Sequence, residues 1–119
     1  MNHNKMAAMP EYTDGMFFLY DITDEDGERR IRRRVMAPVW FRDIGVYDRT
    51  RVTFEQADMQ ITRKIRIPKW DGINSNCVCI IDGCQHKVFN KADVISKQGF
   101  LETELTLINP PMDYEEVTE

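Results

Sequence analysis

Three cysteines and one histidine lie close enough in the sequence to suggest a metal site. Cys77 and Cys79 are separated by one residue, and Cys84 and His86 follow after an Asp82-Gly83 turn. Alternate residues of a strand share one face, so a hairpin makes a Cys3His zinc site geometrically conceivable. Structural zinc sites favour cysteines separated by two residues, however, and cysteine is often a small buried core residue. We therefore expect no bound metal.

Cysteine and histidine are also the residue types of a nucleophilic catalytic site. Cys84 beside His86 lacks a third group that would orient the histidine, and His3 lies in a polar terminal stretch. The six glycines stand alone at turn-like sites, which does not match a phosphate-binding loop. We expect no catalytic residues, no cofactor and no enzymatic activity.

A basic block is the second feature with chemical potential. It consists of Arg29, Arg30, Arg32, Arg33 and Arg34. On a strand these arginines point to both faces, so one solvated face does not explain all five. The remaining explanations are ion pairs, an acidic protein surface, DNA passing nearby, or a charged edge strand that prevents unwanted pairing.

Trp70 lies in a loop between Pro68 and Asp71-Gly72, where it either anchors an interface or covers one end of the fold. The candidate partner-binding residues are therefore Trp70 and the five arginines of the basic block. Among partners, we favour an acidic protein surface over DNA.

Composition restricts the remaining classes. The chain has 119 residues, a hydrophobic fraction of 42% and a net charge of −4, typical of one globular domain without a general attraction to nucleic acid. An odd number of closely spaced cysteines favours free thiols in a reducing cytoplasm. The chain shows neither a membrane-spanning apolar run nor the apolar core of a signal peptide, so we expect no membrane partner.

The hydrophobic pattern predicts strands. Met59, Ile61, Ile65 and Ile67 alternate with polar residues, with Arg63 as the only break, and residues 101–107 alternate in the same way. Asp82-Gly83 is the strongest hairpin signal. About six short strands predict an all-β protein, either a small barrel or a sandwich, over residues 15–110. Residues 1–14 and 111–119 are expected to be flexible arms, the second of them acidic.

The order of several segments resembles the head–tail connector, or head closure, proteins of tailed phages and prophages. These segments are Val39-Trp40-Phe41, 53–57, Ile65-Arg66-Ile67, Ile80-Ile81-Asp82-Gly83, Val88-Phe89 and 102–107. The resemblance implies a homo-oligomeric ring beneath the portal that joins the head to the tail and helps to retain packaged DNA. It implies contacts with portal or adaptor protein and with tail proteins, in the virion neck after assembly in the host cytoplasm.

Two other functions stay open at this point. One is a tail-terminator or tail-completion protein, which is also β-rich and ring-forming. The other is a small β-barrel module that binds single-stranded nucleic acid through exposed aromatic residues.

Overall fold

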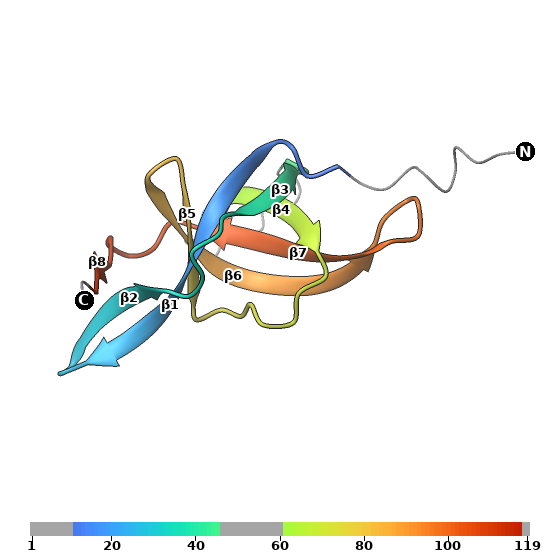
Figure 1. The fold of residues 1–119 in the computed structure, drawn as a ribbon. Helices are drawn as coiled ribbons and strands as arrows, with labels where there is room; N and C mark the ends of the chain where they lie inside the picture. The colour runs from blue at the N-terminus through green and yellow to red at the C-terminus, as the bar shows by residue number, and fades with distance from the viewer. Residues whose placement is uncertain (1–10, 46–60, 118–119) are drawn as a thin grey trace, which may run out of the picture.

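The computed structural model describes residues 11–45 and 61–117, and it confirms the predicted all-β class (Figure 1). Residues 46–60 and most of the predicted N-terminal arm lie outside the described residues. The strands are β1 (Gly15–Glu25), β2 (Glu28–Arg33), β3 (Val39–Asp43), β4 (Ile61–Pro68), β5 (Cys77–Ile81), β6 (Cys84–Ile95), β7 (Leu101–Ile108) and β8 (Glu115–Glu116).

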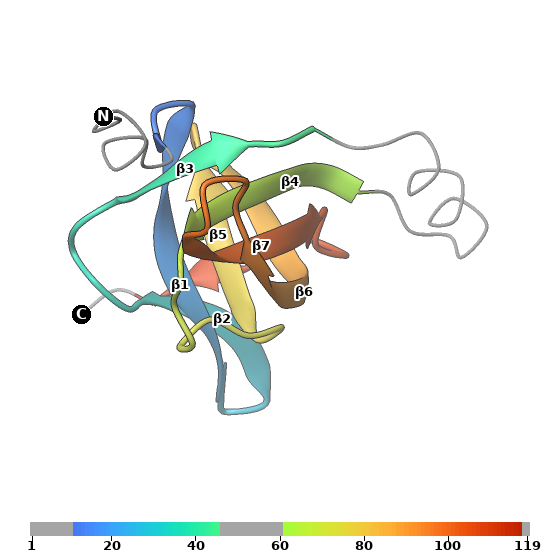
Figure 2. The ribbon, with the colours of Figure 1, turned by 90° about the vertical axis from the view of Figure 1, so that its right-hand side faces the viewer.

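Six of these strands close into an antiparallel barrel, which decides between the barrel and the sandwich. The sheet runs β3-β4-β7-β6-β5-β1, and a further pairing of β3 with β1 closes it (Figure 2). β1 pairs with β5 along one edge and is long enough to pair with two strands along the other. Gly15 to Phe17 pair with β3, whereas Tyr20 to Glu25 pair with β2, which projects with β1 as a hairpin (Figure 1). Closure removes the open edges of the barrel strands.

Two hairpin turns have the geometry that their sequences predict. Asp82 and Gly83 have φ angles of 50° and 81°, and Asp26 and Gly27 have φ angles of 54° and 81°. Positive φ at both central residues is typical of a two-residue type I′ turn, whose twist matches that of the flanking strands. The predicted hairpin between β5 and β6 is confirmed.

The barrel interior is filled by the apolar face of each strand. Phe17, Leu19, Phe41, Ile65 and Leu105 are completely buried there. Full burial of one such side chain contributes about 1.5–3 kcal/mol, so these residues account for much of the stability of the barrel.

Irregularities occur where the sequence pattern breaks. The predicted break at Arg63 coincides with a shift in register between Ile61 and Arg63, as expected for a β-bulge. A second shift, between Val88 and Asn90, lets β6 continue to Ile95 as one strand. The stretch from residue 28 to residue 43 forms two strands, β2 and β3. Pro38, which cannot donate a backbone hydrogen bond, lies in the connection between them.

Both terminal stretches contact the barrel within the described residues. The backbone N–H of Asp14 donates to the carbonyl of Phe41 at 3.0 Å, which extends the pairing of β1 with β3. In the predicted acidic tail, β8 pairs in parallel with β2, and Val117 N–H donates to the Ile31 carbonyl at 2.8 Å. The sequence predicted a flexible tail over residues 111–119, whereas the structure places residues 114–117 against the sheet.

Candidate functional site

Three of the five arginines in the basic block make ion pairs within the chain. Arg30 pairs with Glu28 at 2.9 Å, and Arg32 pairs with Glu25 at 3.0 Å. Each of these contacts lies within the β1–β2 hairpin. Arg30 pairs along its own strand and Arg32 pairs across to β1, so ion pairs within the hairpin account for part of the block without an external partner.

Arg34 makes the most extensive of these contacts. Its Nε donates to Asp21 Oδ2 at 2.9 Å, its Nη2 contacts Asp21 Oδ1, and its Nη1 donates to the Gly72 carbonyl at 2.6 Å. The hydrogen bond from Arg34 lowers the pKa of the Asp21 carboxyl below its usual value. Arg34 therefore ties the end of β2 to the loop that leads into β5.

The other two arginines differ in their surroundings. The Arg33 guanidinium lies 4.2 Å from the centre of the Phe18 ring and donates to the carbonyls of Val35 and Met36. Arg29 is exposed, and among the described residues it makes no ion pair. Arg29 is consequently the member of the block best placed to meet a partner.

Trp70 packs against the barrel core, and its backbone N–H donates to Thr103 Oγ1 at 2.9 Å. These contacts are those of a residue that covers one end of the barrel, which was one of the two interpretations of its position. The exposed tryptophan is instead Trp40, with 51% of its surface accessible. An alternating strand does not reveal which of its faces is covered, so the sequence does not distinguish Trp40 from the buried aromatic residues.

Two exposed apolar pairs stand out on the surface. Met16 and Trp40 are direct cross-strand neighbours on β1 and β3, and they are 40% and 51% exposed. Ile95 and Leu101 are the last pair of β6 and β7 before the connecting turn, and they are 67% and 56% exposed. The two pairs belong to different strand pairs, β1–β3 and β6–β7, and each exposes apolar surface.

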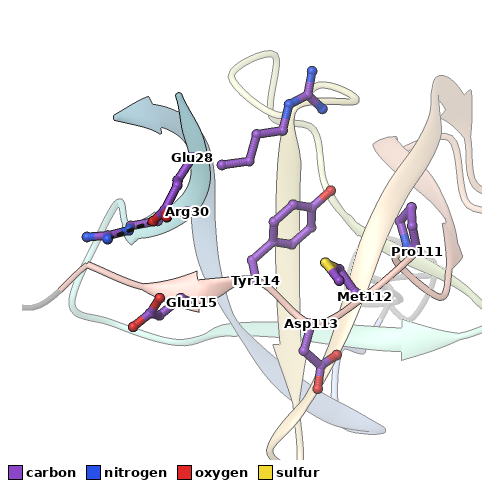
Figure 3. Close-up of a pocket in the computed structure, with 8 residues that line it drawn as sticks. Glu28, Arg30, Pro111, Met112, Asp113, Tyr114 and Glu115 are labelled. Carbon is purple, nitrogen blue, oxygen red and sulfur yellow. Dashed lines mark hydrogen bonds and ion pairs between the residues drawn. The ribbon is translucent and has the colours of Figure 1, made fainter. Parts of the chain in front are cut away.

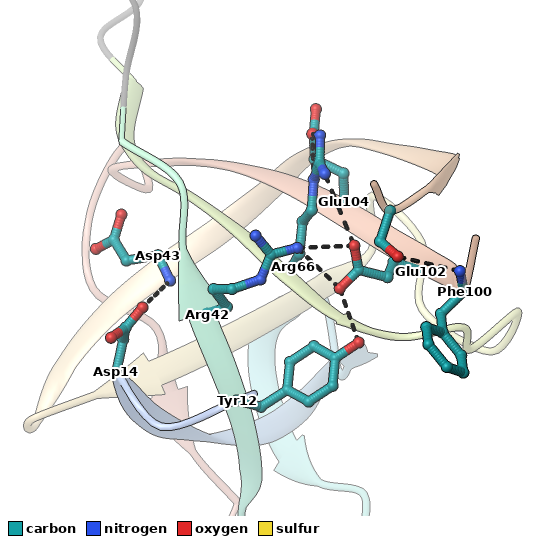
Figure 4. Close-up of polar contacts among 9 residues, drawn as sticks. Tyr12, Asp14, Arg42, Asp43, Arg66, Phe100, Glu102 and Glu104 are labelled. Atoms are coloured by element: carbon teal, nitrogen blue, oxygen red, sulfur yellow. Dashed lines mark hydrogen bonds and ion pairs between the residues drawn. The ribbon is translucent and has the colours of Figure 1, made fainter. Parts of the chain in front are cut away.

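A charged cluster occupies the outer face of β3, β4 and β7 (Figure 4). Glu102 is completely buried and accepts two hydrogen bonds from Arg42 Nη2, at 2.8 and 3.0 Å. Arg66 Nη1 lies 3.7 Å from the same carboxylate, and Tyr12 Oη donates to it at 2.7 Å. Burial and this hydrogen bond raise the pKa of Tyr12 to about 12. Four residues distant in sequence thus fix the segment before β1 onto the barrel.

The cysteines do not form the conceivable zinc site. Cys77 and Cys79 are completely buried in the core, whereas Cys84 is exposed. Burial raises the pKa of both the Cys77 and the Cys79 thiols, which keeps them protonated and unreactive. His86 Nδ1 lies 2.8 Å from Thr62 Oγ1. Within residues 11–45 and 61–117, no three His, Cys, Asp or Glu side chains gather as metal ligands.

A groove of about 490 Å³ opens between β2 and the segment that follows β7 (Figure 3). Its lining comes from Glu28, Arg29 and Arg30 on one side and from residues 111–115 on the other. Met112 is 74% exposed at its margin. The groove separates residues 111–113 from the adjacent part of β2.

Comparison with known proteins assigns no function to this chain. Neither a protein-family model nor a curated protein matches this chain. Among the described residues, no helix has the length and apolar character needed to cross a membrane.

Proposed function

We propose that this protein is a non-enzymatic structural subunit of a tailed phage or prophage, and that it forms a ring at the head–tail interface. In this role it joins the portal to the tail and helps to retain packaged DNA. The observation that carries the proposal is the presence of two separate exposed apolar pairs, Met16–Trp40 and Ile95–Leu101. The resemblance in segment order to head–tail connector proteins supplies the biological setting.

Two different contact points suit a head-to-tail contact between identical copies. In such a contact, one patch of each copy binds the other patch of the next copy, and the series closes when the rotation between copies divides a full turn. A symmetric dimer would instead use the same patch twice. Trp40 provides the large aromatic surface that commonly anchors interfaces, and Leu101 with Ile95 provides an aliphatic surface for it to cover.

The charge arrangement of the β1–β2 hairpin favours protein partners over a tight grip on DNA. Arg30, Arg32 and Arg34 already face carboxylates of the same chain. A guanidinium that is ion-paired must lose that partner before it binds a phosphate. We therefore expect weak DNA binding with a shallow dependence on salt, compatible with a subunit that surrounds DNA without holding it.

The head-to-tail contact is tested with two single variants, Trp40→Asp and Leu101→Asp, studied separately and as an equimolar mixture by sedimentation velocity. Each variant alone should remain monomeric at concentrations where the unsubstituted chain assembles. The mixture should form a dimer that grows no further, because each copy retains one intact patch. Met36→Asp, at a residue that is 79% exposed and outside both pairs, is the matched control and should assemble normally.

Assembly of both variants like the unsubstituted chain, or a mixture that stays monomeric, would contradict the head-to-tail contact. The position in the particle is tested separately, by pull-down against the portal protein and the tail-tube protein encoded in the same genome. Preferential capture of the tail-tube protein would favour a tail terminator over a head–tail connector.

A further inference from the structure

The C-terminal segment, residues 112–117, covers a second apolar cluster on the outside of the barrel. This outer cluster contains the buried residues Tyr20, Ile31 and Val78, and Tyr114 packs against it. The cluster comes from β1, β2 and β5, on the face opposite the barrel core. Without the C-terminal segment, the apolar side chains on this face would lose part of their cover.

Polar contacts fix the segment in register. Gln85 Nε2 donates to the Tyr114 carbonyl at 2.8 Å, and Tyr114 N–H donates to Gln85 Oε1 at 2.9 Å. Farther along, Arg30 pairs with Glu115 and Ile31 with Glu116 in a short parallel ladder. We call the surface formed by the outer cluster, Gln85 and the edge of β2 that pairs with β8 the tail-binding face.

The connection before the segment favours an extended path. It runs from Ile108, the end of β7, through Asn109, Pro110 and Pro111. Consecutive prolines lack backbone donors and stiffen the chain, and the residue before a proline is also held extended. The groove of about 490 Å³ between this connection and β2 shows that the connection does not pack closely against that strand.

We infer that, in the assembled ring, the C-terminal segment of each copy binds the tail-binding face of the adjacent copy instead of its own. This inference rests on the proposed ring and names the residues that link its subunits. The C-terminal segment fits the adjacent copy because the two copies are identical. The neighbouring face therefore offers the same apolar cluster, the same Gln85 amide and the same β2 edge. The five residues between Ile108 and Tyr114 span at most about 17 Å, so the binding position for Tyr114 on the adjacent face has to lie within about that distance of the end of β7.

The exchange conserves every contact of the segment, so its free energy depends on the connection alone. Closed and exchanged forms differ only in the effective concentration of the face and in the strain of the connection. In a ring the adjacent face is held permanently nearby. A stiff, poorly packed connection loses little when it is redirected, which favours exchange on assembly.

A mixed-chain disulfide experiment tests this exchange. One full-length chain carries Arg30→Cys, the other carries Glu115→Cys, and both carry Cys84→Ser, which removes the exposed native thiol. Neither chain can form this disulfide within itself. After co-assembly and oxidation with oxidised glutathione, random mixing predicts that about half of the chains become covalent dimers and none become larger species.

Two controls make the outcome interpretable. Lys97→Cys, in the turn after β6, replaces Arg30→Cys as a matched exposed thiol and should give no dimer. The double variant Arg30→Cys/Glu115→Cys in dilute monomer should close its own disulfide, which shows that both substitutions are tolerated. If it does not close, Ile31→Cys with Glu116→Cys, the next pair along the ladder, takes its place.

The possible failures are distinguishable. Rings that form normally by sedimentation but yield no mixed-chain dimer overturn the exchange and leave the ring intact. Chains that never assemble overturn the proposed function, and the exchange falls with it. Dimers that also appear with Lys97→Cys would show nonspecific thiol coupling and would likewise overturn the exchange.

Discussion

Substitution of Arg42 by methionine should strongly destabilise the barrel. Glu102 is completely buried, and Arg42 supplies two of its hydrogen bonds, at 2.8 and 3.0 Å. Methionine keeps most of the side-chain volume but removes the positive charge. The buried carboxylate then retains only the Tyr12 hydroxyl and Arg66 at 3.7 Å. A buried charge that loses its main partner has no water to replace it.

The expected magnitude is at the lower end of the known range. Removing one partner of a buried ion pair typically costs 3–5 kcal/mol, so about 3 kcal/mol is expected here. Two observations favour the lower value: the Arg42 side chain is 32% exposed, and Arg66 still faces the carboxylate. For a chain of this length, about 3 kcal/mol lowers the melting temperature by roughly 10 °C.

Equilibrium urea unfolding of three variants measures the effect. Arg42→Met should lower the free energy of unfolding with an unchanged m-value. Arg42→Met/Glu102→Leu should recover most of the loss, because an apolar replacement of both partners leaves no buried charge behind. Arg30→Met, which removes the exposed pair with Glu28, is the matched control and should change little.

Two results would refute the reasoning. If Arg42→Met lowers the free energy of unfolding by less than about 1 kcal/mol, the Arg42–Glu102 contact contributes no more than an exposed ion pair. Glu102 would then not depend on Arg42. A double variant as unstable as the single variant would mean that packing of Arg42, rather than charge compensation, stabilises this face.

Three further predictions follow from single groups. The Tyr12 hydroxyl ionises near pH 10 in the unfolded chain but only near pH 12 in the folded protein. The stability that its neutral form contributes is therefore complete below pH 10 and is lost as the pH rises to about 12. Absorbance at 295 nm should show a late-titrating tyrosine that Tyr12→Phe removes. In native protein, Ellman's reagent should modify Cys84 promptly and Cys77 and Cys79 only after urea is added, and early modification of all three would contradict their burial. Gly83→Ala, at φ 81°, should lower the free energy of unfolding by about 1–2 kcal/mol in the same urea assay, and no change would contradict a type I′ turn.

The sequence by itself determined the local structure of this protein. Alternation along residues 101–107 and the Asp82-Gly83 turn predicted strands and a hairpin that the structure contains. These features depend on backbone sterics and on side chains two residues apart, which a short stretch of sequence specifies completely. The break in alternation at Arg63 likewise marked the bulge in β4.

Only the tertiary structure decided what covers each strand. Glu102 occupies a polar position of an alternating strand, which a sequence assigns to solvent, yet Arg42 and Tyr12 bury it. Trp40 is an apolar residue on β3, yet it is half exposed, whereas Trp70, which lies in a loop, packs against the core. Barrel closure through β3 and β1 sets these neighbours, and they are up to 90 residues apart in the chain. Burial depends on such long-range pairing, because the pattern of a strand defines its two faces but not which neighbour lies against each.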